Sequence, residues 1–210
     1  MNQEPNNQKE AETLHAGEQS KKRSFVHSLF DYVELFAWSI FVVMILFTFA
    51  IRLCRVNGSS MENTLLDGQN LLIYNLGYTP KQDDIIVFHL PDRSGENTLV
   101  KRVIATGGQE LKIDFEAKEI YVDGILYEDS HAVLKWGGRE IGEYVGIPPN
   151  HHYNSNTKTF SATIPDGHLF VMGDNRNNSN DSRYSAIGFV DNRYVLGKVI
   201  LRLSPFEIYH

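Results

Sequence analysis

One apolar stretch, LFAWSIFVVMILFTFAI, runs from Leu35 to Ile51 without a charged residue and divides the chain into two unequal parts. As an α-helix it would span about 25 Å, a little less than the ~30 Å hydrocarbon core of a bilayer. No polar face recurs at helical spacing within it, which favours contact with lipid. A core helix of a soluble protein and a cleaved secretory signal are the alternatives, although no Ala-x-Ala site closely follows. We therefore expect a transmembrane helix over residues 31–54.

The two flanks of this stretch indicate its orientation. Residues 1–30 begin with a segment rich in Asn, Gln and Glu that has no apolar periodicity, so we expect a disordered tail. Three basic residues, 21–23, precede the stretch, whereas Arg52 and Arg55 follow it. This bias favours a cytoplasmic N-terminus. The sequence therefore predicts a single-pass protein of the cell membrane, with residues 55–210 as an extracytoplasmic domain.

The chain beyond residue 55 has the pattern of a β domain. Short apolar runs of strand length alternate with turns rich in Gly, Pro and Asp. An Asp-Gly turn within residues 120–127 is typical of a β-hairpin. No long amphipathic helix is apparent, so we expect a mainly β fold, an antiparallel sheet or barrel-like domain. Residues 129–159 are less regular and are expected to form an inserted hairpin region. The apolar runs are 71–74, 85–88, 99–104, 169–172 and 199–201.

Composition argues against several classes of function. The formal net charge of -6 argues against nucleic acid as a main partner. The one cysteine, Cys54, excludes a disulfide-stapled scaffold. The eight histidines show neither a His-Glu-x-x-His motif nor metal-ligand spacing with cysteine. We therefore expect neither a metal nor another cofactor, and the oligomeric state stays open.

Three polar segments could carry chemistry. The segment NGSSMENTL, residues 57–65, contains Ser60 shortly after the apolar stretch. The segment LVKRVIA, residues 99–105, contains Lys101 within an apolar run. The segment GDNRNNSNDSR, residues 173–183, is more polar than a turn requires and indicates Arg–Asp pairs that hold a hydroxyl in place. Each segment also has an ordinary interpretation: a serine in a turn, a solvated strand edge and a polar loop.

Lys101 is the most unusual of these residues. Strand alternation places it on one face with Leu99 and Val103. Burial on an apolar face would disfavour the ammonium form and lower the pKa of the lysine. An amine that is neutral near pH 7 can accept a proton from a serine hydroxyl. A Ser–His–Asp triad remains compatible with the composition, but no segment indicates which histidine it would use.

In this order and behind an apolar anchor, the three segments resemble the type I signal peptidases, most closely the short Gram-positive kind with one membrane anchor. The similarity runs from the anchor nearly to the C-terminus. It implies a membrane-anchored serine endopeptidase that cleaves signal peptides from exported preproteins with a Ser/Lys dyad. Ser60 would be the nucleophile. Lys101 would be the general base and then the acid that protonates the leaving amine.

The resemblance implies further roles. Ser179 would hydrogen-bond the Lys101 amine and orient it, and the backbone N–H of Ser60 would belong to the oxyanion hole. Met61 would help to line shallow pockets for small residues of a preprotein strand added to a sheet edge. Gly58 stands where some members have a serine that adds an oxyanion donor. The structural ion pairs beneath the site would be formed by Asp181, Arg183, Asp174 and Arg102.

Two other functions are compatible with these features. A self-cleaving Ser/Lys peptidase resembling the SOS-response repressors would have a related fold, but no clear Ala-Gly autocleavage site precedes Ser60. A catalytically silent or client-restricted membrane-tethered β domain, for example one that assembles pilins, would bind surface proteins. In each membrane-bound case the expected partners are preproteins with signal peptides and the lipid bilayer.

Overall fold

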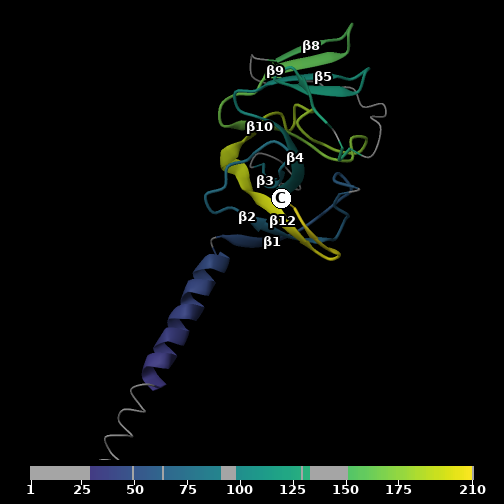
Figure 1. The fold of residues 1–210 in the computed structure, drawn as a ribbon. Helices are drawn as coiled ribbons and strands as arrows, with labels where there is room; N and C mark the ends of the chain where they lie inside the picture. The colour runs from purple at the N-terminus through teal and green to yellow at the C-terminus, as the bar shows by residue number, and fades with distance from the viewer. Residues whose placement is uncertain are drawn as a thin grey trace, which may run out of the picture. The chain divides into compact units, whose positions relative to one another are not determined.

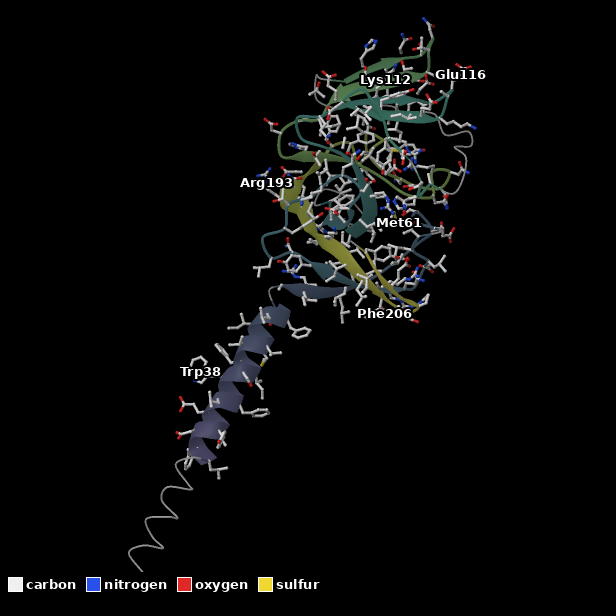
Figure 2. The ribbon with its side chains drawn as sticks, in the orientation of Figure 1. Trp38, Met61, Lys112, Glu116, Arg193 and Phe206 are labelled. Atoms are coloured by element: carbon white, nitrogen blue, oxygen red, sulfur yellow. The ribbon has the colours of Figure 1, made fainter. Side chains whose placement is uncertain are left out.

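The computed structural model describes residues 29–48, 50–62, 64–90, 98–128, 130–132 and 151–209. The chain divides after Thr48 into two units. The first contains one helix, Leu29–Thr48, which is long and apolar enough to cross a membrane. Its side chains are exposed, and Figure 2 shows Trp38 projecting from it. The expected tail at residues 1–30 lies outside the described residues except for the first two residues of this helix.

Strand β1 (Ile51–Arg55) begins shortly after the helix and belongs to the second unit. It pairs antiparallel with β2 (Asn70–Tyr74) along its whole length. This ladder supplies the backbone hydrogen bonds that a continued helix would otherwise have supplied. We expected the membrane span to cover residues 31–54, but residues 51–54 lie in strand β1. The β domain therefore starts before residue 55.

The second unit is mainly β, which confirms the predicted fold class. Each predicted apolar run lies within a strand, and the 120–127 hairpin is present. Asp123 and Gly124 in its turn both have positive φ, 52° and 77°, as a two-residue turn of type I′ requires. The remaining strands are β3 (Ile85–His89), β4 (Thr98–Thr106), β5 (Glu110–Asp114), β6 (Glu119–Val122), β7 (Ile125–Leu126), β8 (His151–Asn154), β9 (Thr159–Thr163), β10 (His168–Met172), β11 (Val190–Asp191), β12 (Val195–Leu203) and β13 (Phe206–Ile208).

These strands form two antiparallel sheets. One has the order β1-β2-β12-β3-β4-β10-β11, with β13 paired to β12, and the other has the order β7-β6-β5-β9-β8. Figure 1 shows β5, β8 and β9 at one end of the domain and β1, β2 and β12 at the other. Within the region 129–159, the structure describes β8 and the first residue of β9, which belong to a hairpin that continues to Thr163. Residues 129 and 133–150 lie outside the described residues.

Burial on both faces explains why the sequences of the central strands are continuous apolar runs. Ile85 and Val87 of β3 pack into one buried cluster, whereas Ile86 and Phe88 pack into another on the opposite face. A strand buried on both faces needs apolar residues at every position. β4 lies between β3 and β10 in the same sheet, and this central place buries polar side chains that it carries.

Candidate active site

Ser60 and Lys101 meet in the structure. Lys101 Nζ donates hydrogen bonds to Ser60 Oγ at 2.8 Å and to the Val100 carbonyl oxygen at 2.9 Å. The lysine is only 2% exposed, and Leu99 and Val103 pack together in one cluster, as alternation along β4 predicted. The interpretation of this segment as a solvated strand edge is therefore wrong. Two bonds to fixed oxygens hold the amine beside the serine hydroxyl.

The turn that carries Ser60 is anchored by its apolar residues. Met61 and Leu65 are buried in the core below it, and the Leu65 N–H donates to the Met61 carbonyl at 2.8 Å. Gly58 has a φ of 87° and donates its N–H to Asp67 Oδ1 at 2.9 Å. A side chain at that φ would be strained. The turn thus explains why glycine stands at position 58.

The third polar segment clamps this turn. The Asn175 N–H donates to the Ser60 carbonyl at 3.1 Å, and Asn175 Nδ2 donates to the Ser59 carbonyl at 3.0 Å. Asn178 Nδ2 donates to Ser59 Oγ at 2.7 Å. No role for these asparagines could be assigned from the sequence, although the density of asparagines in residues 173–183 was a signal. Their amides can bond free carbonyls of a turn, which no strand ladder satisfies.

Gly173 allows the clamp to approach so closely. A Cβ atom built on it would lie 2.3 Å from Ser179 Oγ and 2.4 Å from the Ser60 carbonyl oxygen. Ser179 is fully buried, and its hydroxyl reaches no partner at hydrogen-bonding geometry among the described residues. It lies beside the Asp181 carboxylate and still helps to stabilise that charge. The expected bond from Ser179 to Lys101 is not formed in this arrangement.

The four expected charged residues form two buried ion pairs. Arg183 contacts Asp181 through Nε and Nη2, both at 2.8 Å, and Arg102 contacts Asp174 at 2.9 and 2.7 Å. Burial by itself would raise the pKa of Asp181, but the charge and hydrogen bonds of Arg183 hold it below the ordinary value. Burial opposes the charge of Arg102 as well, and Asp174 raises its pKa. Both pairs are charge-assisted, bidentate contacts that fix the segments they join.

A cavity of about 160 Å³ adjoins the dyad. It is lined by residues of β1, by residues 98–101 of β4 and by the turn residues Ser60 and Met61. Met61 is only 1% exposed, so it belongs mainly to the core and forms part of the cavity wall. β10 pairs with β4 from Arg102 to Thr106, and residues 98–101 of β4 pair with β3. The same part contains no group of three or more His, Cys, Asp or Glu placed to hold a metal ion.

The family model and the curated relatives that match this chain are all described as signal peptidases. The family model described as signal peptidase, peptidase S26, matches residues 29–204. A probable signal peptidase I-1 of Synechocystis sp. is 33% identical over 159 residues, covering 71% of this chain and 69% of that protein. Signal peptidase IB of Staphylococcus aureus is 28% identical over 182 residues, covering 85% and 91%. A crystal structure of a signal peptidase I from Enterococcus faecalis matches with a TM-score of 0.41 and 26% identity, covering 58% of this chain and 97% of that one.

Proposed function

Because the chain belongs to the signal peptidase family, peptidase S26, we propose that it is a signal peptidase I in which Ser60 and Lys101 carry out the cleavage. The observation that carries this proposal is the 2.8 Å contact between Lys101 Nζ and Ser60 Oγ. A serine becomes a strong nucleophile when a neighbouring base accepts its proton, and the buried amine is placed to do so. The substrates are preproteins with signal peptides.

The reaction divides into two steps. Ser60 Oγ attacks the scissile carbonyl carbon while its proton passes to an uncharged Lys101 Nζ, and the resulting ammonium protonates the leaving amine as the peptide bond breaks. Water then attacks the acyl-enzyme, with Lys101 again taking a proton, and the Ser60 hydroxyl is restored. Burial favours the uncharged amine on which both steps depend. The carbonyl of Val100 limits the positions that the amine can take.

The developing oxyanion requires donors of its own. We assign one to the backbone N–H of Ser60, and a donor of this kind is typically worth about 3 kcal/mol of transition-state stabilisation. Gly58 supplies no hydroxyl, so any second donor comes from another group. Ser179, in this proposal, orients Lys101 after its side chain turns from Asp181 toward the amine. Ser179→Ala should then lower kcat without changing KM.

The substrate strand fits beside the dyad. Residues 98–101 of β4 line one wall of the cavity beside Ser60, and residues of β1 line another, so strand backbone borders the cavity on both walls. An extended peptide can therefore add its backbone to the sheet next to Ser60. A cavity of about 160 Å³ suits the small side chains expected before a signal-peptide cleavage site.

The helix Leu29–Thr48 supports a membrane anchor, with the N-terminus cytoplasmic and the β domain extracytoplasmic. This topology brings the enzyme to signal peptides that lie in the same bilayer. Treatment of intact cells with an added protease that reaches only the outer surface of the membrane tests this orientation. The β domain should be degraded in such cells, whereas its survival until the cells are lysed would contradict the proposed orientation.

Cleavage of a purified preprotein tests the dyad directly. The full-length chain should cut the preprotein at its signal-peptide junction, and Ser60→Ala and Lys101→Ala should each abolish cleavage. Ser161→Ala and Lys112→Ala make the same changes on the other sheet and should retain activity. Full activity in either dyad variant would refute the mechanism. A stoichiometric complex of wild-type protein and intact preprotein, without turnover, would favour the silent-domain alternative.

A further inference from the structure

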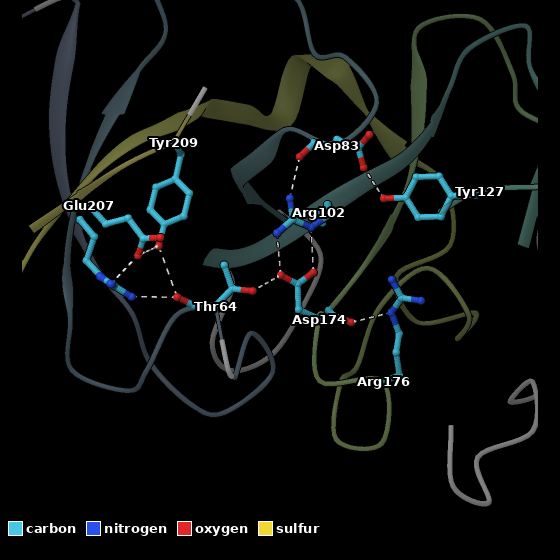
Figure 3. A network of polar contacts seen from close by, with 10 residues as sticks. Thr64, Asp83, Arg102, Tyr127, Asp174, Arg176, Glu207 and Tyr209 are labelled. Atoms are coloured by element: carbon cyan, nitrogen blue, oxygen red, sulfur yellow. Dashed lines mark hydrogen bonds and ion pairs between the residues drawn. The ribbon is translucent and has the colours of Figure 1, made fainter. Parts of the chain in front are cut away.

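Thr64, four residues after Ser60, joins three segments of the domain (Figure 3). Its hydroxyl donates to Asp174 Oδ2 at 2.5 Å, and Asp174 is paired with Arg102, the residue after Lys101 on β4. Its carbonyl oxygen accepts hydrogen bonds from Arg202 Nη1 at 3.0 Å and from the Tyr209 hydroxyl at 3.3 Å. One residue of the Ser60 turn is thus tied both to the strand of Lys101 and to the C-terminal end of the chain.

The two donors are held in place within their own hairpin. Arg202 of β12 donates Nε to the Pro205 carbonyl at 2.9 Å and pairs with the Glu207 carboxylate. Tyr209 follows β13, and its backbone N–H donates to the Ile200 carbonyl at 2.9 Å. The β12–β13 hairpin therefore presents both side chains in a fixed arrangement, so little side-chain entropy is lost when they bind Thr64.

Of the two hydrogen bonds to the Thr64 carbonyl, the one from Arg202 is the stronger. The single hydroxyl proton of Tyr209 is shared between the Thr64 carbonyl and Glu207 Oε2, which lies 3.1 Å away. Burial raises the pKa of Tyr209 to about 12, with Arg202 opposing and Glu207 adding to the shift, so the hydroxyl keeps its proton. The Arg202 guanidinium instead directs one N–H at Thr64 at the shorter distance. A cationic donor also makes the stronger hydrogen bond.

Packing leaves this side of the turn incompletely supported. A cavity of about 270 Å³ adjoins the junction and is lined by Thr64, Arg102, Tyr209 and their neighbours. Where a cavity replaces packed atoms, dispersion contacts do not hold the backbone. The hydrogen bonds to the Thr64 carbonyl, together with the bond from its hydroxyl to Asp174, therefore restrain this side of the turn. Because Leu65 N–H bonds the Met61 carbonyl, movement at Thr64 is passed to the residues beside Ser60.

We propose that Arg202, assisted by Tyr209, is a positioning residue for the nucleophile: by fixing the Thr64 carbonyl, the β12–β13 hairpin holds the Ser60 turn against Lys101. This inference rests on the proposed function, because it gives Arg202 a role in the same reaction. Arg202 itself lies outside the cavity beside the dyad, so its loss should leave substrate binding unaltered.

The test compares preprotein cleavage by full-length variants, each assayed well below its unfolding temperature. Arg202→Met should lower kcat about tenfold, since a small misplacement of a nucleophile is costly, and should leave KM unchanged. Arg202→Lys keeps one cationic donor and should restore most of the lost kcat. Tyr209→Phe, a gentler change that keeps the ring, should lower kcat about twofold to threefold.

Matched controls come from the exposed η1 turn (Asn192–Tyr194). Arg193 forms an ion pair with Asp191, as Arg202 does with Glu207. Figure 2 shows Arg193 on the other side of the domain from Met61. Arg193→Met and Tyr194→Phe should leave kcat unchanged. Arg202→Met with wild-type kcat, or with a loss that Arg202→Lys does not reduce, would overturn the positioning role.

The two proposals fail in different ways. If Ser60→Ala still cleaves the preprotein, the proposed function fails whatever Arg202 does. If Ser60→Ala is inactive while Arg202→Met and Tyr209→Phe cleave as fast as wild type, the dyad stands and the positioning role of the hairpin is lost.

Discussion

Ser60 and Lys101 lie within hydrogen-bonding distance, but the fold holds the two residues in different ways. Lys101 belongs to a regular strand, β4, whose pairing with β3 runs from Ile85 opposite Arg102 to His89 opposite Thr98. Ser60 belongs to a turn whose carbonyl groups are bonded by Asn175, a residue 116 positions beyond Ser59. The position of the lysine follows from the sheet, whereas the position of the serine depends on remote polar contacts.

This difference separates stability from activity. A change beside Lys101 within the sheet removes packing but leaves the strand ladder in place, so it should mainly lower the free energy of unfolding. A change in the clamp around Ser60 alters the distance between nucleophile and base, so it should mainly lower kcat. Substitutions in the two regions can therefore test the comparison, and a residue that supports both regions should have the largest effect.

Arg183→Met should have that largest effect. Asp181 accepts from Arg183 and also from the Gly173 N–H at 3.0 Å, so the pair fixes the start of the clamp. Removing the arginine leaves a buried carboxylate without its counter-charge, which typically costs about 3–5 kcal/mol. Chemical denaturation of the full-length protein in detergent measures the loss. Arg193→Met breaks an exposed pair and should cost less than about 1 kcal/mol. Equal losses in the two variants would contradict the prediction.

The same pair predicts a dependence of stability on pH. The folded-state pKa of Asp181 is below its ordinary value of 3.8, so the carboxylate stabilises the folded protein above that pH. This contribution should be lost as the pH falls through the folded-state pKa. Unfolding measured between about pH 5 and pH 2 should show a smaller acid destabilisation in Asp181→Asn than in wild type. Parallel curves for the two proteins would show that Asp181 is not linked to folding in this way.

Gly173→Ala should have the next largest effect, and this effect should be a loss of kcat. The new Cβ would overlap both Ser179 Oγ and the Ser60 carbonyl, so the turn and the clamp must separate. We expect kcat to fall about 100-fold, as for a displacement of about 1 Å. Gly77→Ala is the control, because its Cβ meets open space although its φ of 65° also disfavours alanine. If Gly77→Ala lost as much activity as Gly173→Ala, the loss would not depend on displacement of Ser60, and the prediction would be wrong.

The regular half of the site could be predicted from the sequence. The apolar run around Lys101 has the periodicity of a strand, and that periodicity alone places the lysine on a buried face. The same holds for the Asp-Gly hairpin turn. The start of the β domain could not be predicted in this way, because Ile51–Arg55 begins at the last residue of the apolar stretch and is held as a strand by its pairing with the distant β2.

The irregular half could be predicted only in part. The density of polar residues in 173–183 indicated a network, and its Arg–Asp pairs were expected from residue type. Which carbonyl Asn175 or Arg202 bonds depends on three-dimensional proximity, which leaves no local pattern. Ser179 shows the same limit, because its place beside Gly173 and Asp181 depends on how the segment folds and leaves no local pattern in the sequence.

Val103→Ala tests the other region of the comparison, the regular strand that carries Lys101. Val103 is fully buried in β4, two residues after Lys101 on the same face. Removing its methyl groups should lower the free energy of unfolding by about 2 kcal/mol, while the paired strand keeps its course. Specific activity measured well below the unfolding temperature should stay within about twofold of wild type. A large loss of kcat would show that the strand does not position the lysine by its ladder alone.

Asn178→Ala should have the smallest effect and tests the clamp at its outer edge. The Asn178 amide donates to Ser59 Oγ at 2.7 Å in an exposed position, so its loss should scarcely change stability. A contact worth about 1 kcal/mol should still lower kcat about fivefold if it restrains the residue before the nucleophile. Asn156→Ala in the exposed β8–β9 turn is the control. If the contact acts as a unit, Ser59→Ala should have the same effect, and the double variant should be no slower than either single one. Independent, multiplying losses would mean that each residue acts separately, and that the turn is held from its inner side alone.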